Sequence, residues 1–211
     1  MKVYSLDSFV NNKHTRAIKS IVFHTGVKLE GNCLYRHNSD FKIRDHKEVD
    51  NLRYNIHALA KRSKRILEVG FNAGHSALLS FLANPTVYFL AFDIASHAYT
   101  VPCAKYLSNY YNLELVTGNS KKTIPEYKAP RSKFDLIHVD GGHSQTMASN
   151  DIMNCKKFAK KNTLLLVDDA NQKGVKTVIE QYIKDGILEE VPLKQLKLKE
   201  TKYHKLFRYL D

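Results

Sequence analysis

Cysteine is scarce in this sequence, and the cysteines that occur lie far apart. There are three, Cys33, Cys103 and Cys155, and none belongs to a C-x-x-C pair. Neither a disulfide framework nor a structural zinc site is indicated, because both use numerous or closely spaced cysteines. Unpaired thiols are typical of a reducing compartment, so we expect a cytoplasmic protein.

Long apolar segments are also missing. The opening residues, MKVYSLDSFVNNKH, contain no sustained apolar run of the kind found in a signal peptide. No stretch of about 18 apolar residues, the length that crosses a membrane, occurs in the chain. We therefore expect a soluble, unsecreted protein with no membrane partner.

The sequence does contain enough apolar material for one core. Its 211 residues are 43% hydrophobic, which suits a single α/β domain covering the whole chain. The net charge of +12 raises nucleic acid as a partner. The lysines are nevertheless scattered, with local clusters at residues 61–65, 156–161 and 194–205. This distribution favours a solvated surface over an RNA-binding groove.

Residues 65–93 have the pattern of a βαβ unit. Ile66, Leu67 and Val69 form a short apolar run typical of a buried parallel strand, a glycine turn follows at residues 70–74, and residues 76–82 are expected to be helical. The segment VYFLAFD then predicts a second buried strand. Asp93 at its end lies about twenty residues past the turn, where a Rossmann-type site places the acid that binds ribose hydroxyls.

The glycine turn does not fit a dinucleotide. Such a site needs G-x-G-x-x-G, whose middle glycine lets the backbone approach a pyrophosphate, and Asn72 occupies that position. The order is instead Glu68-Val-Gly-Phe-Asn-Ala-Gly74, and its acid would repel a phosphate and suit a cation. This order resembles motif I, E/D-x-G-x-x-x-G, of the class I S-adenosylmethionine (SAM)-dependent methyltransferases. A plain structural βαβ turn is the alternative.

The resemblance implies which residues bind the cofactor SAM. The turn would cradle its methionine end, and Asp93 would hold its ribose. Asn119 follows an expected strand at residues 113–118, where the third motif of the family contacts adenine; a plain turn with Ser120 capping the next helical turn is the alternative. The implied cofactor contacts are Glu68, Gly70, Phe71, Asn72, Ala73, Gly74, Ser76, Asp93, Asn119, Ser120 and Asp140.

Residues 1–64 are expected to form a helical cap on this core. Residues 9–24 and 49–60 have loosely helical apolar spacing, and the turn-rich stretch 26–45 joins them. In the methyltransferases that the chain resembles, such a segment often covers the cofactor or shapes the acceptor pocket.

The core, residues 65–211, alternates strands and helices. The pattern predicts an α/β fold: a seven-stranded, mostly parallel, Rossmann-like sheet with an antiparallel C-terminal strand, as in class I methyltransferases. After the βαβ unit we expect helices at residues 97–111, 144–161 and 173–184, and strands at residues 113–118, 134–140, 163–169, 188–191 and 206–210.

Aspartates follow several of the expected strands. Ligands bind at the carboxyl ends of strands in open α/β sheets, and adjacent strands lie about 4.8 Å apart. Asp140, Asp168 and Asp169 are therefore expected to converge with one another. Converging carboxylates repel, and a bound divalent cation, preferably Mg²⁺, would relieve the repulsion.

The surrounding residues resemble a known metal-binding pattern. Val-Asp140-Gly-Gly-His143 and Val-Asp168-Asp169 match the metal-binding positions of macrocin-type O-methyltransferases. The more distant catechol-type enzymes have Asp-Asn at the second place. The resemblance implies Asp140, Asp168 and Asp169 as metal ligands. The alternative is that Asp168, Asp169 or Asn171 caps the helix that begins near Gln172.

The candidate catalytic residues are Asp140 and His143. His143 is a candidate general base because the ordinary pKa of histidine lies near the working pH, and an ordinary helix-start residue is the alternative. Asp140 or a water molecule could accept the proton instead, because a metal lowers the pKa of a bound hydroxyl.

These observations together predict a metal-assisted O-methyltransferase that uses SAM and acts on a hydroxyl of a small molecule or a sugar. The first rival is a nucleic-acid methyltransferase or RNA-binding module, although neither an RNP1-type signature nor a clear Lys-Asp-Lys-Glu tetrad is present. The second rival is a catalytically silent Rossmann-like partner protein. Sequence spacing indicates neither the acceptor nor whether the protein forms a homo-oligomer.

Overall fold

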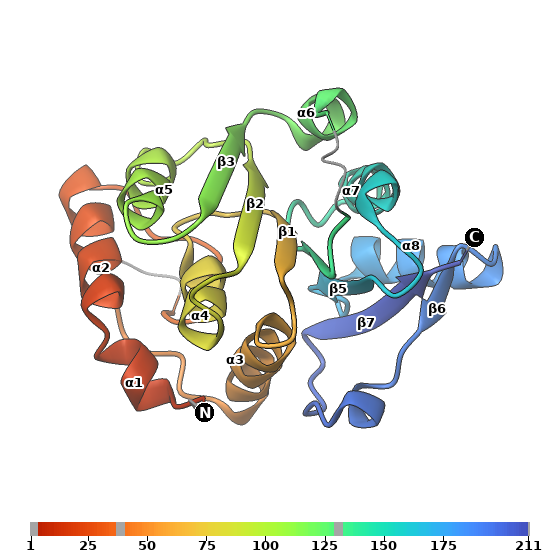
Figure 1. Cartoon of the computed structure of the whole chain (residues 1–211), viewed down its shortest axis with the longest axis horizontal. Helices are drawn as coiled ribbons and strands as arrows, with labels where there is room; N and C mark the ends of the chain where they lie inside the picture. The colour runs from red at the N-terminus through yellow and green to blue at the C-terminus, as the bar shows by residue number, and fades with distance from the viewer. Residues whose placement is uncertain (1–3, 37–40, 129–132, 211) are drawn as a thin grey trace.

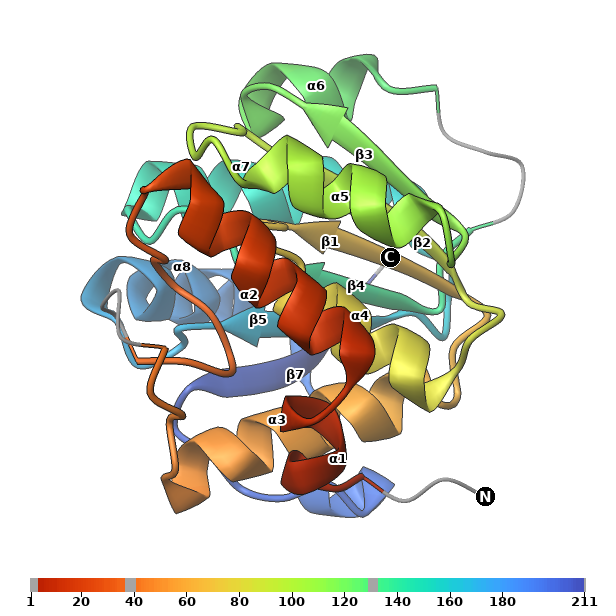
Figure 2. The same cartoon turned by 90° about the vertical axis from the view of Figure 1, so that its left-hand side faces the viewer.

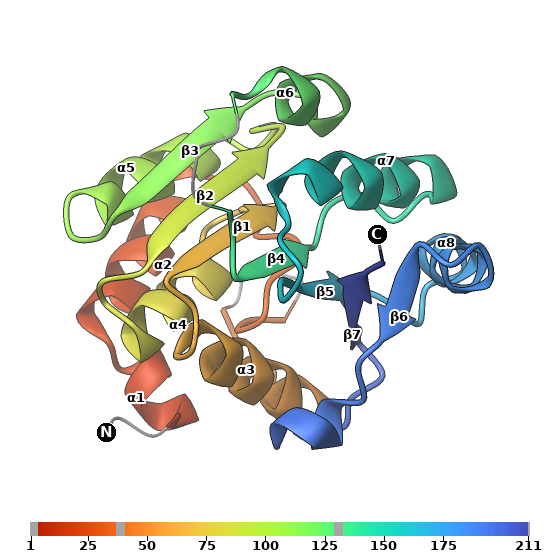
Figure 3. The ribbon, with the colours of Figure 1, turned by 45° about the vertical axis from the view of Figure 1, so that its right-hand side comes forward.

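Seven strands form one sheet in the computed structural model, which describes residues 4–36, 41–128 and 133–210. The strands are β1 (Arg65–Val69), β2 (Tyr88–Asp93), β3 (Leu113–Thr117), β4 (Leu136–Val139), β5 (Leu164–Asp168), β6 (Leu188–Glu190) and β7 (His204–Tyr209). Their order across the sheet is β3-β2-β1-β4-β5-β7-β6 (Figures 1 and 3). Neighbouring strands run parallel, except that β7 is antiparallel to both β5 and β6. The predicted Rossmann-like sheet with an antiparallel C-terminal strand is confirmed.

Helices cover both faces of the sheet. They are α1 (Leu6–Val10), α2 (Lys13–Thr25), α3 (Lys47–Ala60), α4 (His75–Ala83), α5 (Thr100–Ser108), α6 (Ser120–Glu126), α7 (Gln145–Cys155), α8 (Lys173–Lys184) and two short 3₁₀ helices, η1 (Lys156–Phe158) and η2 (Leu193–Leu196). One face carries α3, α4 and α5, with α2 lying across α4 and α5 as an outer layer (Figure 2). The other face carries α6, α7 and α8 (Figure 3).

Side chains of each strand alternate between two separate cores. Ile66 of β1 and Leu166 of β5 belong to the core beneath α2 to α5. Leu67 and Val167, the next residues along, belong to the core beneath α6 to α8. This is the two-residue period of a strand that is buried on both faces.

Several predicted helices have different limits in the structure. The helix expected at residues 9–24 is two helices, because the Asn12 side chain accepts a hydrogen bond from the His14 N–H (2.8 Å) and starts α2 afresh. The helix expected at residues 144–161 leaves α-helical geometry after Cys155 and ends as η1. Helix α6 was not predicted as an element, because it buries only Ile124 and contains Pro125.

The N-terminal segment is organised by one buried cation. The Arg53 side chain on α3 is fully buried and donates to the Tyr4 hydroxyl (2.9 Å) and to the carbonyls of Cys33 (3.0 Å) and Arg44 (3.2 Å). Its second terminal nitrogen lies 3.4 Å from the Asp50 carboxylate. Arg53 thus ties residues 33 and 44 of the predicted turn-rich stretch to α3. Residues 37–40 of that stretch lie outside the described residues.

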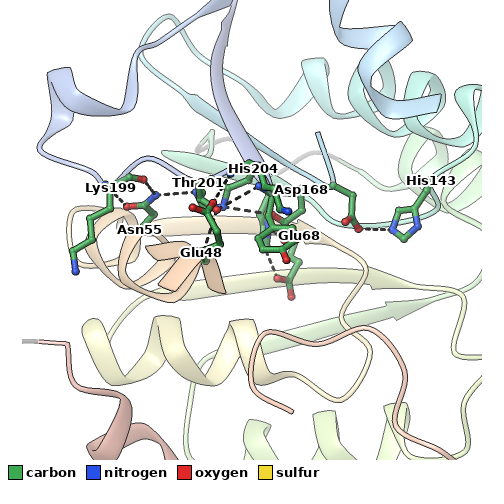
Figure 4. Close-up of polar contacts among 12 residues, drawn as sticks. Glu48, Asn55, Glu68, His143, Asp168, Lys199, Thr201 and His204 are labelled. Carbon is green, nitrogen blue, oxygen red and sulfur yellow. Dashed lines mark hydrogen bonds and ion pairs between the residues drawn. The ribbon is translucent and has the colours of Figure 1, made fainter. Parts of the chain in front are cut away.

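Helix α3 also binds the loop before β7. The Asn55 side chain pairs with the Lys199 backbone, accepting from its N–H (2.8 Å) and donating to its carbonyl (2.7 Å). Asn51 donates to the Glu200 carbonyl (2.7 Å), and Glu48 accepts from the Lys202 N–H (2.9 Å). These contacts fix the start of β7 against α3 (Figure 4). Within the described residues, none of the helices is long and apolar enough to span a bilayer.

Replacing Arg53 with leucine should lower the free energy of unfolding by about 3 kcal/mol, because buried carbonyl oxygens lose their donors and Asp50 loses its counter-charge. Urea denaturation followed by circular dichroism measures the change. The control is Arg16→Leu, which removes one exposed hydrogen bond to the Asn11 carbonyl and should change stability by less than about 1 kcal/mol. Equal effects of the two substitutions would show that Arg53 does not organise the segment.

Candidate active site

A cavity of about 910 Å³ lies at the carboxyl ends of the parallel strands. Residues that follow β1, β2, β4 and β5 line it, and residues 28–33 of the N-terminal segment add a further wall. The order of the strands reverses between β1 and β4, so the cavity lies at the topological switch point where open α/β sheets bind ligands.

The turn after β1 is held by close backbone packing. Gly70 has a φ of +97°, and a Cβ atom there would collide with the carbonyl of Asp140. Only glycine fits this approach of the two strand ends. Asn72 donates from Nδ2 to the carbonyls of Glu30 (2.6 Å) and Gly31 (2.7 Å), so the turn also positions the N-terminal segment over the cavity.

Asp93 is fixed by two backbone N–H groups. Its Oδ2 accepts from Asn72 (2.8 Å) and its Oδ1 from Ala95 (2.7 Å). These bonds orient the carboxylate, and each oxygen keeps a further lone pair for a ligand hydroxyl.

Most of the predicted cofactor contacts line the cavity. They are Gly70, Phe71, Asn72, Ala73, Ser76, Asp93, Asn119, Ser120 and Asp140. Gly74 does not, because it packs against the side chains of Phe71 and Leu107. Glu68 does not line the cavity either: it is fully buried within the sheet, and its Oε1 is 2.9 Å from His138.

The turn after β3 is capped by a different residue from the one predicted. The Asn119 Oδ1, and not Ser120, accepts from the Lys121 N–H (3.0 Å) and starts α6. The cap uses the side-chain oxygen, and the amide nitrogen of Asn119 takes no part in it. Because both residues line the cavity, the capped turn and the predicted adenine contact are compatible.

Four ionisable side chains form a row across the sheet, on the face that α3 covers; we call Glu68, His138, Asp168 and His204 the inner row. Strand register places Glu68 opposite His138 and Asp168 opposite His204. His138 Nδ1 lies 2.9 Å from Glu68, and its Nε2 lies 3.6 Å from Asp168 Oδ2. His204 Nδ1 lies 3.4 Å from Asp168 Oδ1 (Figure 4). Neither histidine was a predicted site residue.

The hydrogen bonds of Asn55 assign the tautomer of His204. The Lys199 N–H donates to the Asn55 oxygen, so the Asn55 nitrogen must be the atom 2.9 Å from His204 Nε2. That nitrogen donates, so His204 Nε2 is an acceptor and the ring proton is on Nδ1, which faces Asp168.

The inner row separates the pKa values of its members. Burial alone would lower the pKa of His138, but Asp168 and Glu68 outweigh it and hold that pKa well above its usual value. Burial would raise the pKa of Asp168, but His138 and His204 outweigh it and hold that pKa well below its usual range. Burial and then the Asp168 charge raise the pKa of Asp140.

Asp140, His143 and Asp169 form a second group, which we call the outer cluster. One ligand atom from each lies within 4.8 Å of the others, and all three residues line the cavity. His143 Nε2 is 2.7 Å from Asp169 Oδ2 (Figure 4), a hydrogen bond that raises the pKa of His143 against the effect of burial. The predicted convergence of Asp140, Asp168 and Asp169 therefore includes two histidines, His138 and His143.

The helix-capping alternative does not match the geometry. Helix α8 begins after Gln172, and its first turn has no side-chain cap from Asp168, Asp169 or Asn171. Asp169 instead has a φ of +52°, a conformation that turns the chain out of β5.

His75 is a cavity residue that the sequence analysis did not single out. It begins α4, is 3% exposed, and neither ring nitrogen has a hydrogen-bond partner among the described residues. Burial lowers its pKa to about 4, so the ring is neutral near neutral pH. No signal marks it in the sequence beyond its place next to Gly74.

Comparison with known proteins adds to this geometry. Residues 67–170 match a family model described as a methyltransferase domain. The match assigns a methyltransferase domain to these residues. None of the curated proteins compared matches the sequence. The predicted identity of a SAM-dependent methyltransferase is confirmed at this level, while the metal and the acceptor stay predictions.

Several solved structures have the same fold as this methyltransferase. The O-methyltransferase TomG from Streptomyces achromogenes, in complex with SAM, is 15% identical, with a TM-score of 0.60 over 93% of this chain and 88% of that one. An O-methyltransferase from Bacillus cereus, in complex with S-adenosylhomocysteine (SAH), is 12% identical, with a TM-score of 0.62 over 93% and 89%. The TDP-rhamnose 3′-O-methyltransferase CalS11 of calicheamicin biosynthesis is 16% identical, with a TM-score of 0.56 over 80% and 82%.

Replacing His75 with phenylalanine should flatten the pH dependence of stability in acid. Between about pH 6.5 and pH 4 the unfolded chain binds a proton at His75 that the folded chain does not. The free energy of unfolding of the wild type therefore decreases as the pH is lowered through this range, by up to about 3 kcal/mol. Urea denaturation at several pH values measures this slope. The exposed His24→Phe variant is the control and should keep the wild-type slope; an unchanged slope in the His75 variant would contradict the buried, neutral ring.

Proposed function

We propose that this protein is a SAM-dependent O-methyltransferase that uses a divalent cation and methylates a hydroxyl of a small molecule, with a sugar as one acceptor class. The observation that carries the proposal is that the cofactor turn, Asp93 and the outer cluster all open into one cavity. A methyl donor and a metal-assisted acceptor would therefore meet in the same space.

The donor would lie along the ends of β1 and β2. The glycine turn is suited to the methionine end because its backbone approaches closely, and Asp93 is suited to the ribose hydroxyls because its carboxylate is already oriented. Asn119 and Ser120 at the start of α6 are the candidates for the adenine edge. The SAM and SAH complexes of the related folds support this placement.

The residues after β4 and β5 fit a cation. Asp140, Asp168 and Asp169 bring carboxylates to the cavity, and the Asp168 charge adds to burial in raising the pKa of Asp140, a repulsion that a dication would relieve. When bound, a divalent cation would supply a Lewis acid that lowers the pKa of an acceptor hydroxyl. Asp140 and His143 are the candidates to take the proton. The other residues of the cavity would accelerate transfer mainly by orienting the donor toward the acceptor.

The cavity wall beside the outer cluster suits a small organic molecule as the methyl acceptor. Leu52 and Ile56 of α3, Tyr203 before β7 and Arg44 line the same cavity as the outer cluster. The CalS11 enzyme acts on a TDP-rhamnose hydroxyl, which makes a sugar hydroxyl a suitable acceptor class to test.

The charged surface gives less support to the nucleic-acid rival. In the cluster at residues 156–161, Lys156 donates to the Leu210 carbonyl, Lys157 to the carbonyls of Pro125 and Tyr127, and Lys160 to Asp135. These three ammonium groups make contacts within the fold, so this cluster favours the small-molecule acceptor over the nucleic-acid rival.

Wild-type protein should bind SAH with micromolar affinity in a calorimetric titration, and Asp93→Ala should weaken binding at least tenfold, because the ribose loses charge-assisted hydrogen bonds. Glu190→Ala, an exposed residue paired with Lys205 on β7, is the control and should leave the affinity unchanged. Absence of SAH binding by the wild type would overturn the proposed function; equal affinity of the Asp93 variant would remove only the ribose assignment.

Asp140→Asn should lower methyl transfer by roughly 100-fold or more while leaving SAH affinity within about threefold, because the change removes a charge from the cation site and keeps a side-chain oxygen for the predicted cofactor contact. Transfer of a labelled methyl group from SAM to a panel of catechols and nucleotide sugars, with Mg²⁺ or Mn²⁺ present, provides the measurement. Loss of SAH binding in this variant would contradict its role. A wild-type protein that binds SAH but methylates nothing in the panel would favour the catalytically silent rival.

A further inference from the structure

The adjacent residues Asp168 and Asp169 occupy different environments. Both Asp168 oxygens face imidazole nitrogens, at 3.6 Å from His138 Nε2 and 3.4 Å from His204 Nδ1. Those two rings are themselves held by Glu68 and Asn55. The protein therefore already supplies the counter-charge for Asp168, although the residue borders the cavity.

In the outer cluster, His143 pairs with Asp169 alone, which leaves Asp140 outside that ion pair. Asp140 and Asp169 bring two carboxylates and His143 one imidazole, with one ligand atom from each within 4.8 Å of the others. His143 is half exposed and reaches Asp169 from the cavity side at 2.7 Å. Two carboxylates and one imidazole on one side of an open cavity are a donor set that holds a dication and leaves room for substrate.

The position of His143 is fixed by the start of α8. A Cβ atom at Gly174 would collide with the His143 carbonyl, so only glycine lets the two segments approach this closely. The Gln172 side-chain amide lies 3.5 Å from His143 Nδ1. A metal-ligating histidine commonly has its second ring nitrogen oriented by such a polar partner, because this sets which nitrogen faces the metal.

We propose that Asp140, His143 and Asp169 hold the divalent cation, and that Asp168 serves as the internal counter-charge of His138 and faces the ring N–H of His204. His143 thereby takes the place that the sequence resemblance gave to Asp168. An imidazole ligand favours first-row transition metals over Mg²⁺, so the site should prefer a dication of the Co²⁺ class. This inference rests on the proposed function, which requires a cation in the cavity.

Titration of the purified protein with Co²⁺ and with Mg²⁺ tests the assignment without an acceptor. Calorimetry gives both affinities, and the visible absorption of Co²⁺ reports whether an imidazole is bound. The wild type should bind Co²⁺ at least tenfold more tightly than Mg²⁺. His143→Gln should lose at least tenfold in Co²⁺ affinity and shift the absorption bands. His143→Asp should restore binding with the preference moved toward Mg²⁺. The control His24→Gln, on an exposed part of α2, should match the wild type.

Asp168→Asn separates the two ligand sets. If this variant folds, its Co²⁺ affinity should stay within about threefold of the wild type. If it does not fold, the variants of the half-exposed His143 decide whether His143 is a ligand. Unchanged Co²⁺ affinity and spectrum in His143→Gln would overturn this inference and leave the proposed function standing with an all-carboxylate site. A wild type that binds neither Co²⁺ nor Mg²⁺ would overturn this inference together with the metal part of the proposed function, while SAH binding tests the donor part separately.

Discussion

The pairing of charges in the inner row is the constraint on which the rest of the site depends. A carboxylate buried in a sheet is costly unless a counter-charge lies beside it. Glu68 and Asp168 are both buried near the cavity, and His138 lies between them, in contact with both. The sheet can carry these two acids in its interior because His138, on the strand between them, contacts both carboxylates and His204 contacts Asp168 from the other side.

This constraint explains the features of the chain that surround the row. Strand β7 runs antiparallel beside β5 and so brings His204 opposite Asp168. Helix α3 then crosses the end of the row, where Asn55 fixes both the His204 ring and the Lys199 backbone. The same helix carries Arg53, which holds the residues 33 and 44 that border the cavity. One helix thus links the buried charges to the wall of the substrate cavity.

The sequence was sufficient to predict the elements whose signal is local. Apolar strands, the glycine turn and the aspartates at the strand ends are read directly from residue order, so the sheet and the convergence of Asp140, Asp168 and Asp169 could be predicted. The inner row could not, because it depends on register: His138 and Asp168 lie thirty positions apart in the sequence, and nothing local marks them as neighbours. The surroundings of Glu68 could not be predicted for a related reason. Its motif indicates a cofactor contact, whereas the two-residue alternation of β1 turns its side chain into the sheet, onto His138.

The two consecutive aspartates show how an identical pair of residues acquires two roles. Asp168 is still in β5, in phase with Leu166, and its side chain faces the histidines of the inner row. Asp169 has left the strand with a φ of +52°, which redirects its carboxylate to His143 at the cavity. A pair of acids in sequence is therefore not a pair of equivalent ligands in space. The backbone turn between them decides that one carboxylate faces the histidines inside the sheet and the other faces His143 at the cavity.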